Sequence, residues 1–504
     1  MLYSYNNIIG GTNFMKKQKK ETNMERWKGL NNFNLRYTAL SENRNTNIQV
    51  VDAICGKGKT QWAIQNLIDN YKHHKDKFIY VTPFLEELDR VYERCKQENI
   101  YVYIPMVRKD ENTKELLSKS KEVFKAMQEG KNIIMTHKLF EYITIDWCEE
   151  IERQDYDLYL DEVPNVFFYD ILSSKDWNLL ISTKMIELGT YLDNCKYPEV
   201  NWIDEYYINS EDKIKGLYEN FINKCVFGQV LKKGNSYIYT LPMHIFFMVR
   251  RCYILTYMFE GQYLAGLLKL YSIPYTLKSV CKPNSKYFLI PYNIQDTIKE
   301  FKEMYTKIHL YEGSLNSKDK RKFALTYTYL NNKDKEIEIK QLKANIHNYI
   351  TNVCPCKSEN TLWTTLKDKK EFLKGSGYTK GFLSLNARST NKYKDRTVLI
   401  YLYNKYINPI YEDLFNAIGG HTGVRSQLDE ELYALSELVQ WMFRSAIREK
   451  KDVYLYLPSY RMREQIFKNF EELFARSYEN YINYNNRINE LIATYKKENL
   501  DNNK

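Results

Sequence analysis

Residues 53–60 read AICGKGKT, and this stretch decides the fold of the chain. Its pattern, A-x-x-G-x-G-K-T, is that of a phosphate-binding loop. The preceding residues 48–52 (IQVVD) have the composition of a short β-strand, and residues 61–70 have the apolar spacing of a helix. A strand, a glycine-bearing loop and a helix, in this order, form the context in which such a loop binds phosphate. This context argues against a chance glycine turn with a surface lysine.

The residue types in the loop match the chemistry of a nucleoside triphosphate. Glycine lets backbone N–H groups close around phosphate oxygens, and the helix N-terminus adds the positive end of its dipole. Lys59 would place a positive charge beside the β- and γ-phosphates, and Thr60 would give Mg²⁺ a hydroxyl ligand. The predicted nucleotide-binding residues are Ala53, Gly56, Lys57, Gly58, Lys59 and Thr60.

A second motif follows about a hundred residues later. Residues 156–162, YDLYLDE, form an apolar run that ends in two carboxylates. This pattern is typical of a buried parallel strand whose carboxyl end faces a ligand. We expect Asp161 to hold Mg²⁺, directly or through water, and Glu162 to orient or deprotonate the attacking water. An exposed Asp-Glu pair at a strand end is the alternative, and the loop upstream favours the catalytic interpretation.

The bulk properties are those of a soluble globular protein, with 504 residues, 44% hydrophobic and 27% charged. Nine cysteines are scattered without paired C-x-x-C motifs, which argues against structural zinc and for a reducing compartment. We find no signal segment and no uninterrupted apolar span, so we expect a cytoplasmic protein without a membrane partner. The net charge of +11 favours a polyanionic partner.

Alternating strand and helix patterns begin at residue 48 and predict parallel sheets covered by helices. The fold class we expect is therefore α/β, with two parallel-sheet domains in tandem. The strands we expect after the first are 78–81, 132–135, 156–160, 253–256, 307–311, 382–385, 398–402 and 453–457. The predicted domains are a flexible basic tail (1–45), a first domain (46–280) with a helical insertion at about 163–248, a second domain (281–465) and a charged helical tail (466–504).

With these motifs placed, the chain resembles superfamily 2 (DExx-box) helicases, and among them the helicases that bacteriophages of low-GC bacteria encode. The loop corresponds to their first motif and Asp161-Glu162 to their second. The resemblance implies two RecA-like domains, ATP and Mg²⁺ as cofactors, and a nucleic-acid partner. It places Thr256 at the position of the Ser-Ala-Thr coupling motif of that family. The nucleic-acid-binding residues that it implies are Thr82, Pro83, Thr136, His137, Arg388 and Asn391.

The second domain contains a further motif, because residues 440–448 (QWMFRSAIR) have the form Q-x-x-x-R-x-x-x-R. Polar groups that recur every four residues lie along one face of a helix. Mostly apolar residues separate them, so we expect a buried helix whose arginines need a partner. The resemblance implies that Gln440 contacts the γ-phosphate or its water, and that Arg444 or Arg448 is the arginine finger. The alternative is a structural arginine pair bonded within the domain.

The sequence therefore predicts a nucleic-acid-dependent ATPase that acts as a helicase or translocase. DNA in phage replication or recombination is the substrate that the resemblance implies, with the host cytoplasm as location and replication proteins as further partners. Two alternatives stay open. One is a motor that translocates on or remodels double-stranded DNA without unwinding it. The other is a replication factor that binds nucleic acid and uses nucleotide as a switch.

Overall fold

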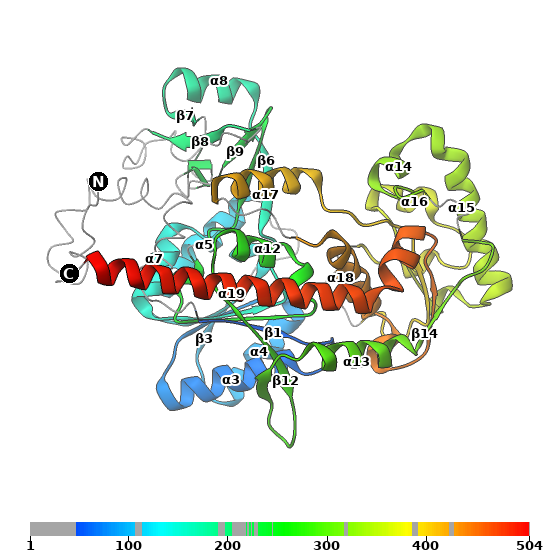
Figure 1. Ribbon diagram of the computed structural model, residues 1–504, viewed down its shortest axis with the longest axis horizontal. Coiled ribbons are helices and arrows are strands. Elements are labelled where there is room, and N and C mark those ends of the chain that lie inside the picture. Colours follow the sequence, from blue (N-terminus) through cyan, green and yellow to red (C-terminus); the bar gives the residue numbers. More distant parts are fainter. Residues whose placement is uncertain are drawn as a thin grey trace.

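The structure is a computed structural model that describes residues 47–105, 113–189, 197–203, 218, 221–222, 224–225, 230–243, 245–316, 321–385, 392–422 and 428–502. Within these ranges the chain forms two α/β domains with parallel sheets and an inserted antiparallel sheet (Figure 1). The prediction of an α/β fold with two RecA-like domains in tandem is confirmed. Arg388 and Asn391 lie outside the described residues.

The first domain is built on an eight-stranded sheet with the order β13-β12-β1-β11-β5-β2-β4-β3. All neighbours in it are parallel except β12 and β13, whose hairpin extends the sheet to Pro291, past the predicted boundary at 281. Helices on both faces leave the central strands buried, which explains their almost continuous apolar sequences. The strands are β1 (Ile48–Asp52), β2 (Phe78–Thr82), β3 (Val102–Tyr103), β4 (Asn132–Thr136), β5 (Asp157–Asp161), β11 (Arg251–Thr256), β12 (Thr276–Cys281) and β13 (Phe288–Pro291).

Neighbouring residues of β1 belong to different cores, since successive side chains of a strand point to opposite faces. Val51 packs with the helices α3 (Lys59–His74) and α4 (Leu85–Gln97). Val50 packs on the other face, where α5 (Thr113–Gln128), α7 (Ile145–Gln154) and α12 (Tyr263–Leu270) lie. Short helical turns, α6 (His137–Phe140), α11 (Ile245–Met248) and η1 (Phe259–Gly261), complete the domain.

The segment between β5 and β11 differs from our prediction of a helical insertion. Its described residues include a five-stranded antiparallel sheet, order β6-β10-β9-β8-β7, together with the helix α8 (Ser174–Ser182), the short helix α11 and helical residues at 218, 221–222 and 224–225. A helix is disfavoured there because strands such as β10 (SYIYT) are rich in aromatic and β-branched residues, which favour strands. The strands are β6 (Phe167–Ile171), β7 (Ile186–Gly189), β8 (Glu199–Trp202), β9 (Leu231–Lys233) and β10 (Ser236–Thr240).

The second domain has a four-stranded parallel sheet with the order β14-β17-β16-β15. Its strands are β14 (Ile308–Leu310), β15 (Thr361–Thr364), β16 (Val398–Tyr401) and β17 (Val453–Tyr456). The predicted strand at 382–385 is wrong, because Phe382 makes only an isolated bridge to Trp363 and β15 takes the edge position. The helices are α13 (Ile294–Tyr305), α14 (Tyr327–Asn331), α15 (Glu336–Asn348), α16 (Lys370–Leu373), α17 (Pro409–Thr422), α18 (Glu430–Met442), the 3-10 turn η7 (Ala446–Glu449) and the π-helix η8 (Arg461–Phe467).

The predicted helical tail is confirmed as the helix α19 (Phe470–Asn502), which runs across both domains (Figure 1). At its start, Phe470 and Phe474 pack against Phe301 of α13 in the core of the second domain. Farther along, the Tyr484 hydroxyl donates to the carbonyl of Ile273 (2.7 Å), within the core of the first domain. The helix therefore bridges the two cores.

We expect Tyr484→Ala to destabilise the first domain by about 3 kcal/mol, because it empties a core position and leaves a buried carbonyl unpaired. Urea unfolding followed by circular dichroism measures this change. The matched control is Ile482→Ala on the exposed side of the same helix, where 38% of the residue is accessible and the change should stay within about 0.5 kcal/mol. Equal effects of the two substitutions would contradict the docking of α19.

Candidate nucleotide site between the two domains

The loop after β1 has the backbone that a phosphate-binding loop needs. Gly56 and Gly58 have φ angles of 87° and 101°, in the left-handed region that favours glycine. A Cβ atom on Gly58 would also collide with the ring of Tyr287, which comes from the β12–β13 hairpin. Gly58 directly precedes α3, so the loop opens onto the N-terminus of a long helix.

Lys59 is buried, and its ammonium group lies within the loop. The Lys59 Nζ atom donates to the carbonyl oxygen of Ala53 at 2.5 Å and to that of Ile54 at 3.4 Å. These acceptors are neutral, so the charge is only partly compensated here. The positive charge is therefore placed beside the glycine turn, where an anion would gain most from it.

Thr60, at the amino end of α3, and Asp161, at the carboxyl end of β5, lie side by side. The Thr60 hydroxyl donates to Asp161 Oδ1 (3.2 Å), and the Tyr80 hydroxyl donates to Asp161 Oδ2 (3.0 Å). Burial raises the pKa of Asp161 to about 7, and the charges of Glu87 and Glu162 add to the rise. A hydroxyl and a carboxylate, with further carboxylates nearby, are the oxygen ligands that a hard divalent cation such as Mg²⁺ prefers.

Glu162 follows β5 with a φ of 64°, a left-handed conformation that is uncommon for residues other than glycine. Its backbone N–H donates to the carbonyl of Leu255 in β11 (2.9 Å), which holds the turn in place. Strained backbone that its surroundings hold in place is concentrated at functional sites. The conformation therefore supports the catalytic interpretation of this residue over an incidental acidic pair.

The second domain reaches this site with a different backbone from the one we expected. The continuous helix through Gln440, Arg444 and Arg448 is wrong, because α18 ends at Met442 and η7 begins at Ala446. Ser445 is extended between them (φ −102°, ψ −169°), and its hydroxyl donates to the carbonyl of Met442 (2.6 Å). Such local side-chain bonds compete with helix continuation.

The two domains meet through Gln440 and Arg444. The Gln440 Nε2 atom donates to the carbonyl of Tyr257, just after β11 in the first domain (3.4 Å). Arg444 is buried, and its Nε atom has no hydrogen-bond partner among the described residues. An unpaired donor on a buried guanidinium is costly, so this atom is suited to an anionic partner.

The charged groups of both domains converge on Cys55 in the loop. Burial raises the pKa of the Cys55 thiol, the positive charges of Lys59, Arg444 and Arg448 counter the rise, and the negative charge of Glu162 adds to it. Charges influence a pKa in this way only at close range. The structure thus brings together predicted residues that lie hundreds of positions apart.

A cavity of about 780 Å³ lies between the domains on the α13 side of the loop, and its lining does not include Lys59, Thr60, Asp161, Glu162 or Arg444. It is formed by the loop (Ile54, Cys55, Gly56 and Lys57), the β12–β13 hairpin, α13, and the segment from Phe443 to Lys450. Lys57 and Glu300 form an ion pair across it. A volume of this size accommodates a nucleotide-sized ligand.

The residues predicted to contact nucleic acid lie at the carboxyl ends of β2 and β4. Thr82 is fully buried, and its hydroxyl has no partner among the described residues. Pro83 is half-buried. The Thr136 hydroxyl caps α6 by accepting from Leu139 N (3.3 Å), and His137 Nε2 lies 2.9 Å from the carbonyl oxygen of Asp161. Their side chains lie inside the domain beside the acidic motif, and their contact with nucleic acid stays a prediction.

Three further residues lie at the site, and the sequence did not predict a role for them there. Tyr80 binds Asp161, as described above. Glu87 in α4 is close enough to raise the pKa of Asp161, and its own pKa is raised by burial and countered by Arg90 and Arg448. In the sequence, Glu87 is distinguished only as an acidic residue in the helix that follows Thr82-Pro83.

Asp52 is the third of these residues. Its buried carboxylate accepts from the backbone N–H groups of Met258 (2.9 Å) and Phe259 (2.8 Å). Met258 has a left-handed φ of 58°, and the loop that it belongs to also carries the Tyr257 carbonyl that Gln440 contacts. Asp52 therefore links the strand before the phosphate-binding loop to the contact between the domains. The aspartate at the end of a strand was visible in the sequence, but its partners were not.

Comparison with known proteins decides the family. Over 420 residues, the chain is 32% identical to the SPbeta prophage-derived protein YonV of Bacillus subtilis (strain 168). The match covers 83% of this chain and 97% of YonV. The chain belongs to the YonV family. Residues 302–471 also match the YonV C-terminal Rossmann-like domain, which agrees with the parallel sheet of the second domain.

Solved structures similar to this YonV-family chain include helicases. Xpd4 of S. tokodaii is 12% identical, with a TM-score of 0.37 over 89% of this chain and 97% of Xpd4. The DUF1998 helicase MrfA, bound to DNA, is 10% identical, with a TM-score of 0.31 over 88% of this chain and 51% of MrfA. Scores this low carry no functional argument.

Two further observations concern the environment of the YonV-family protein. Every helix in the described part of the chain is too short or too polar to cross a bilayer. The cysteines in the same part are all free thiols.

Asp52 makes the stability of the YonV-family protein depend on pH. Burial raises its pKa from 3.8 to about 6, so protonation favours the folded state. This contribution to stability is present below pH 3.8 and is lost as the pH rises through about 6. We expect the wild type to lose about 1 kcal/mol more than Asp52→Asn between about pH 5 and pH 7. Urea unfolding at a series of pH values measures the difference. Parallel pH profiles for the two proteins would contradict it.

Proposed function

We propose that this YonV-family protein is a nucleic-acid-dependent ATPase that acts as a helicase or translocase on DNA. The observation that carries the proposal is the buried Arg444, whose Nε atom lacks a partner among the described residues beside the loop of the other domain. A γ-phosphate between Lys59 and Arg444 would interact with both cations and would give Arg444 Nε the partner that it lacks. A structural arginine pair bonded within its own domain would leave no such donor.

Each residue of the site has a role in this reaction. When bound, ATP with Mg²⁺ supplies the phosphoryl group and the divalent charge that makes it reactive. The glycine turn and Lys59 would hold the phosphates, and the Thr60 hydroxyl with the Asp161 carboxylate would hold the cation. Glu162 would orient the attacking water, and Arg444 would stabilise the charge that develops on the transferred group. Arg448 lines the cavity and is positioned to assist.

The division of these groups between two domains supports a motor. Lys59 and Glu162 belong to one domain and Arg444 to the other, so a triphosphate would interact better with the closed arrangement than with an open one. A ligand shifts a conformational equilibrium by its differential affinity for the two states, so hydrolysis would remove the preference for closure. The contact of Gln440 with the Tyr257 carbonyl would carry the change between the domains.

DNA is the partner we propose. The net charge of +11 favours a polyanion. The prophage origin in the name of the YonV relative supports a role in phage DNA metabolism. Phosphate contacts would then provide most of the affinity, so binding should show little sequence preference and a steep dependence on salt.

Steady-state ATP hydrolysis with Mg²⁺, with and without single-stranded DNA, tests the proposal directly. We expect Lys59→Ala to lower the hydrolysis rate by about 10²-fold or more, because the lysine charge stabilises the transferred phosphoryl group. The matched control is Lys175→Ala on the exposed surface of α8, which should retain the wild-type rate. A wild type whose hydrolysis is indifferent to all forms of nucleic acid would refute the motor.

Arg444→Ala should separate binding from turnover. We expect kcat to fall by about 10²-fold or more while the affinity for a non-hydrolysable ATP analogue changes little, since a finger arginine acts mainly on the transition state. Arg94→Ala, on the surface of α4, is the control. Unaltered DNA-stimulated turnover in Arg444→Ala would assign this arginine a structural role. A strand-displacement assay on the active protein then distinguishes a helicase from a translocase that does not unwind.

A further inference from the structure

Two large aromatic side chains are exposed on the segment that follows β14. Phe323 is 63% accessible and Tyr327 is 61% accessible. Single exposed rings are common, but here a further ring lies against that of Phe323, four residues before Tyr327 in the chain. Tyr406, on the segment after β16, is half-buried, and its ring centre lies 5.6 Å from that of Phe323 at an interplanar angle of 36°. We call Phe323, Tyr327 and Tyr406 the aromatic platform.

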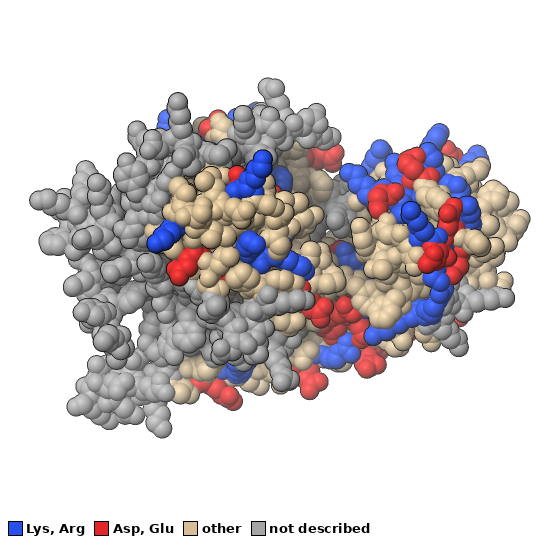
Figure 2. All heavy atoms as spheres, turned by 90° about the horizontal axis from the view of Figure 1, so that it is seen from above, with Lys and Arg blue, Asp and Glu red and all other residues tan. Residues whose placement is uncertain are grey.

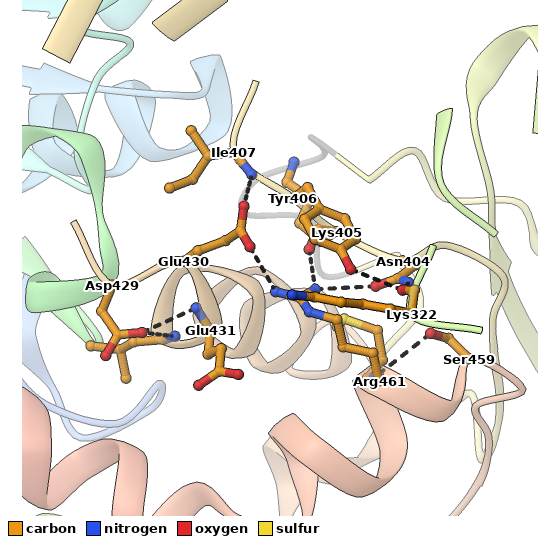
Figure 3. A network of polar contacts seen from close by, with 12 residues as sticks. Lys322, Asn404, Lys405, Tyr406, Ile407, Asp429, Glu430, Glu431, Ser459 and Arg461 are labelled. Atoms are coloured by element: carbon orange, nitrogen blue, oxygen red, sulfur yellow. Dashed lines mark hydrogen bonds and ion pairs between the residues drawn. The ribbon is translucent and has the colours of Figure 1, made fainter. Parts of the chain in front are cut away.

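The segment after β16 holds the backbone on both sides of Phe323 in place, and Figure 3 shows Asn404 and Tyr406 of this segment beside Lys322. The Asn404 side-chain amide donates to the carbonyls of Lys322 (2.8 Å) and Ala324 (3.0 Å). The Asn404 backbone N–H donates to the carbonyl of Leu325 (2.9 Å), and the Tyr406 hydroxyl donates to that of Lys322 (2.9 Å). Phe323 therefore projects from a fixed support.

Arg461 of η8 fixes the other side of this support (Figure 3). It is buried, and its Nη1 atom donates to Asn404 Oδ1 (3.1 Å) and to the carbonyl of Lys405 (2.7 Å). Its Nη2 atom donates to Glu430 Oε1 (3.3 Å), so the guanidinium is paired. The same guanidinium lies 4.0 Å from the centre of the Tyr406 ring and holds that ring by a cation–π contact.

The backbone two residues after Phe323 is in an unfavourable conformation. Leu325 has a left-handed φ of 62°, which is unfavourable for a leucine. Its side chain and Ala324 are buried, whereas the ring of Phe323 directly before them is not. Leu325 does not cap a helix, and residues held in such conformations by their surroundings cluster at active sites and ligand clamps. An apolar ring left in water by such a turn therefore points to a ligand.

The platform lies at the edge of the second sheet where ligands of parallel sheets bind. β14, β16 and β17 are parallel, and their carboxyl ends lead into the three segments that form the platform and its support. Lys322 Nζ lies 5.9 Å from the centre of the Phe323 ring. Figure 2 shows basic and acidic side chains mixed over this lobe, so exposed rings, and not a field of one sign, distinguish the surface.

We infer that the bases of a single nucleic-acid strand stack on the aromatic platform. The inference rests on the proposed function and names the contact by which the second domain grips the strand. Every base has a flat π-face, so stacking on aromatic rings is tolerant of sequence, as a translocating motor requires. The adjacent lysine provides a cation for the backbone phosphate. The fixed support keeps the rings positioned before the strand binds, which lowers the entropy lost on binding.

The test uses a fluorescein-labelled oligothymidine and an abasic strand of the same length, with the full-length protein and anisotropy as the measurement. We expect Phe323→Ala and Tyr327→Ala each to weaken binding of oligothymidine by about tenfold, the typical effect of losing one base–ring stack. Neither substitution should weaken binding of the abasic strand, which has phosphates but no bases. Phe323→Trp should keep the wild-type affinity, since a larger ring preserves the stack.

Tyr101→Ala is the matched control, because Tyr101 is 66% accessible and precedes β3, at the amino end of a strand in the other domain. Binding of oligothymidine by Phe323→Ala that equals binding by Tyr101→Ala overturns the inference and leaves the proposed function standing. An equal loss on the abasic strand also overturns it, because the loop would then act on the backbone alone. If the wild type neither binds strands nor responds to them in hydrolysis, both the inference and the proposed function fall.

Discussion

The arrangement of the site depends on one buried carboxylate. Asp52 ends the strand that leads into the phosphate-binding loop, and it accepts the backbone N–H groups of Met258 and Phe259. Removing this group from water is costly, and the two hydrogen bonds only partly offset the cost, because the pKa stays raised. What the two hydrogen bonds provide is a fixed position for the loop after β11. The loop after β11 is fixed relative to the glycine turn, and its Tyr257 carbonyl is presented to Gln440 of the other domain.

The second domain, which matches the YonV C-terminal domain, and the first domain, which carries the phosphate-binding loop, contribute different residues to this arrangement. The match to the YonV C-terminal domain spans residues 302–471, which include Arg444 and the aromatic platform but not the loop. The first domain provides Lys59, Thr60, Asp161 and Glu162. Neither half holds a complete site, so any chemistry in the cleft depends on how the two halves are held together.

The parts of the structure that could be predicted are those that short stretches of sequence determine. The glycine turn, the acidic pair after an apolar strand and the alternation of strands and helices each depend on neighbouring residues, and the structure contains all three. Other features depend on contacts between distant residues. Asp52, Tyr80 and Glu87 were missed because their partners lie on other elements.

The wrong predictions have local physical reasons as well. The helix through Arg444 was predicted from spacing alone, but the Ser445 hydroxyl bonds the carbonyl of Met442 and ends it. The insertion was predicted to be helical although β10 is rich in aromatic and β-branched residues, which favour strands. In the second domain, β15 was missed and a strand at 382–385 was predicted in its place, because both stretches are short and apolar and only pairing distinguishes them.

The long helix α19 limits how the two lobes can move. It has 33 residues, which corresponds to a rod of about 50 Å at 1.5 Å per residue. Aromatic side chains anchor one end of the rod in the second lobe and its middle in the first. A rod of fixed length prevents the lobes from being pulled apart along its axis, yet it still allows them to turn about that axis. Changes in the relative arrangement of the two lobes are therefore expected to be rotations, and not a separation along the axis of α19.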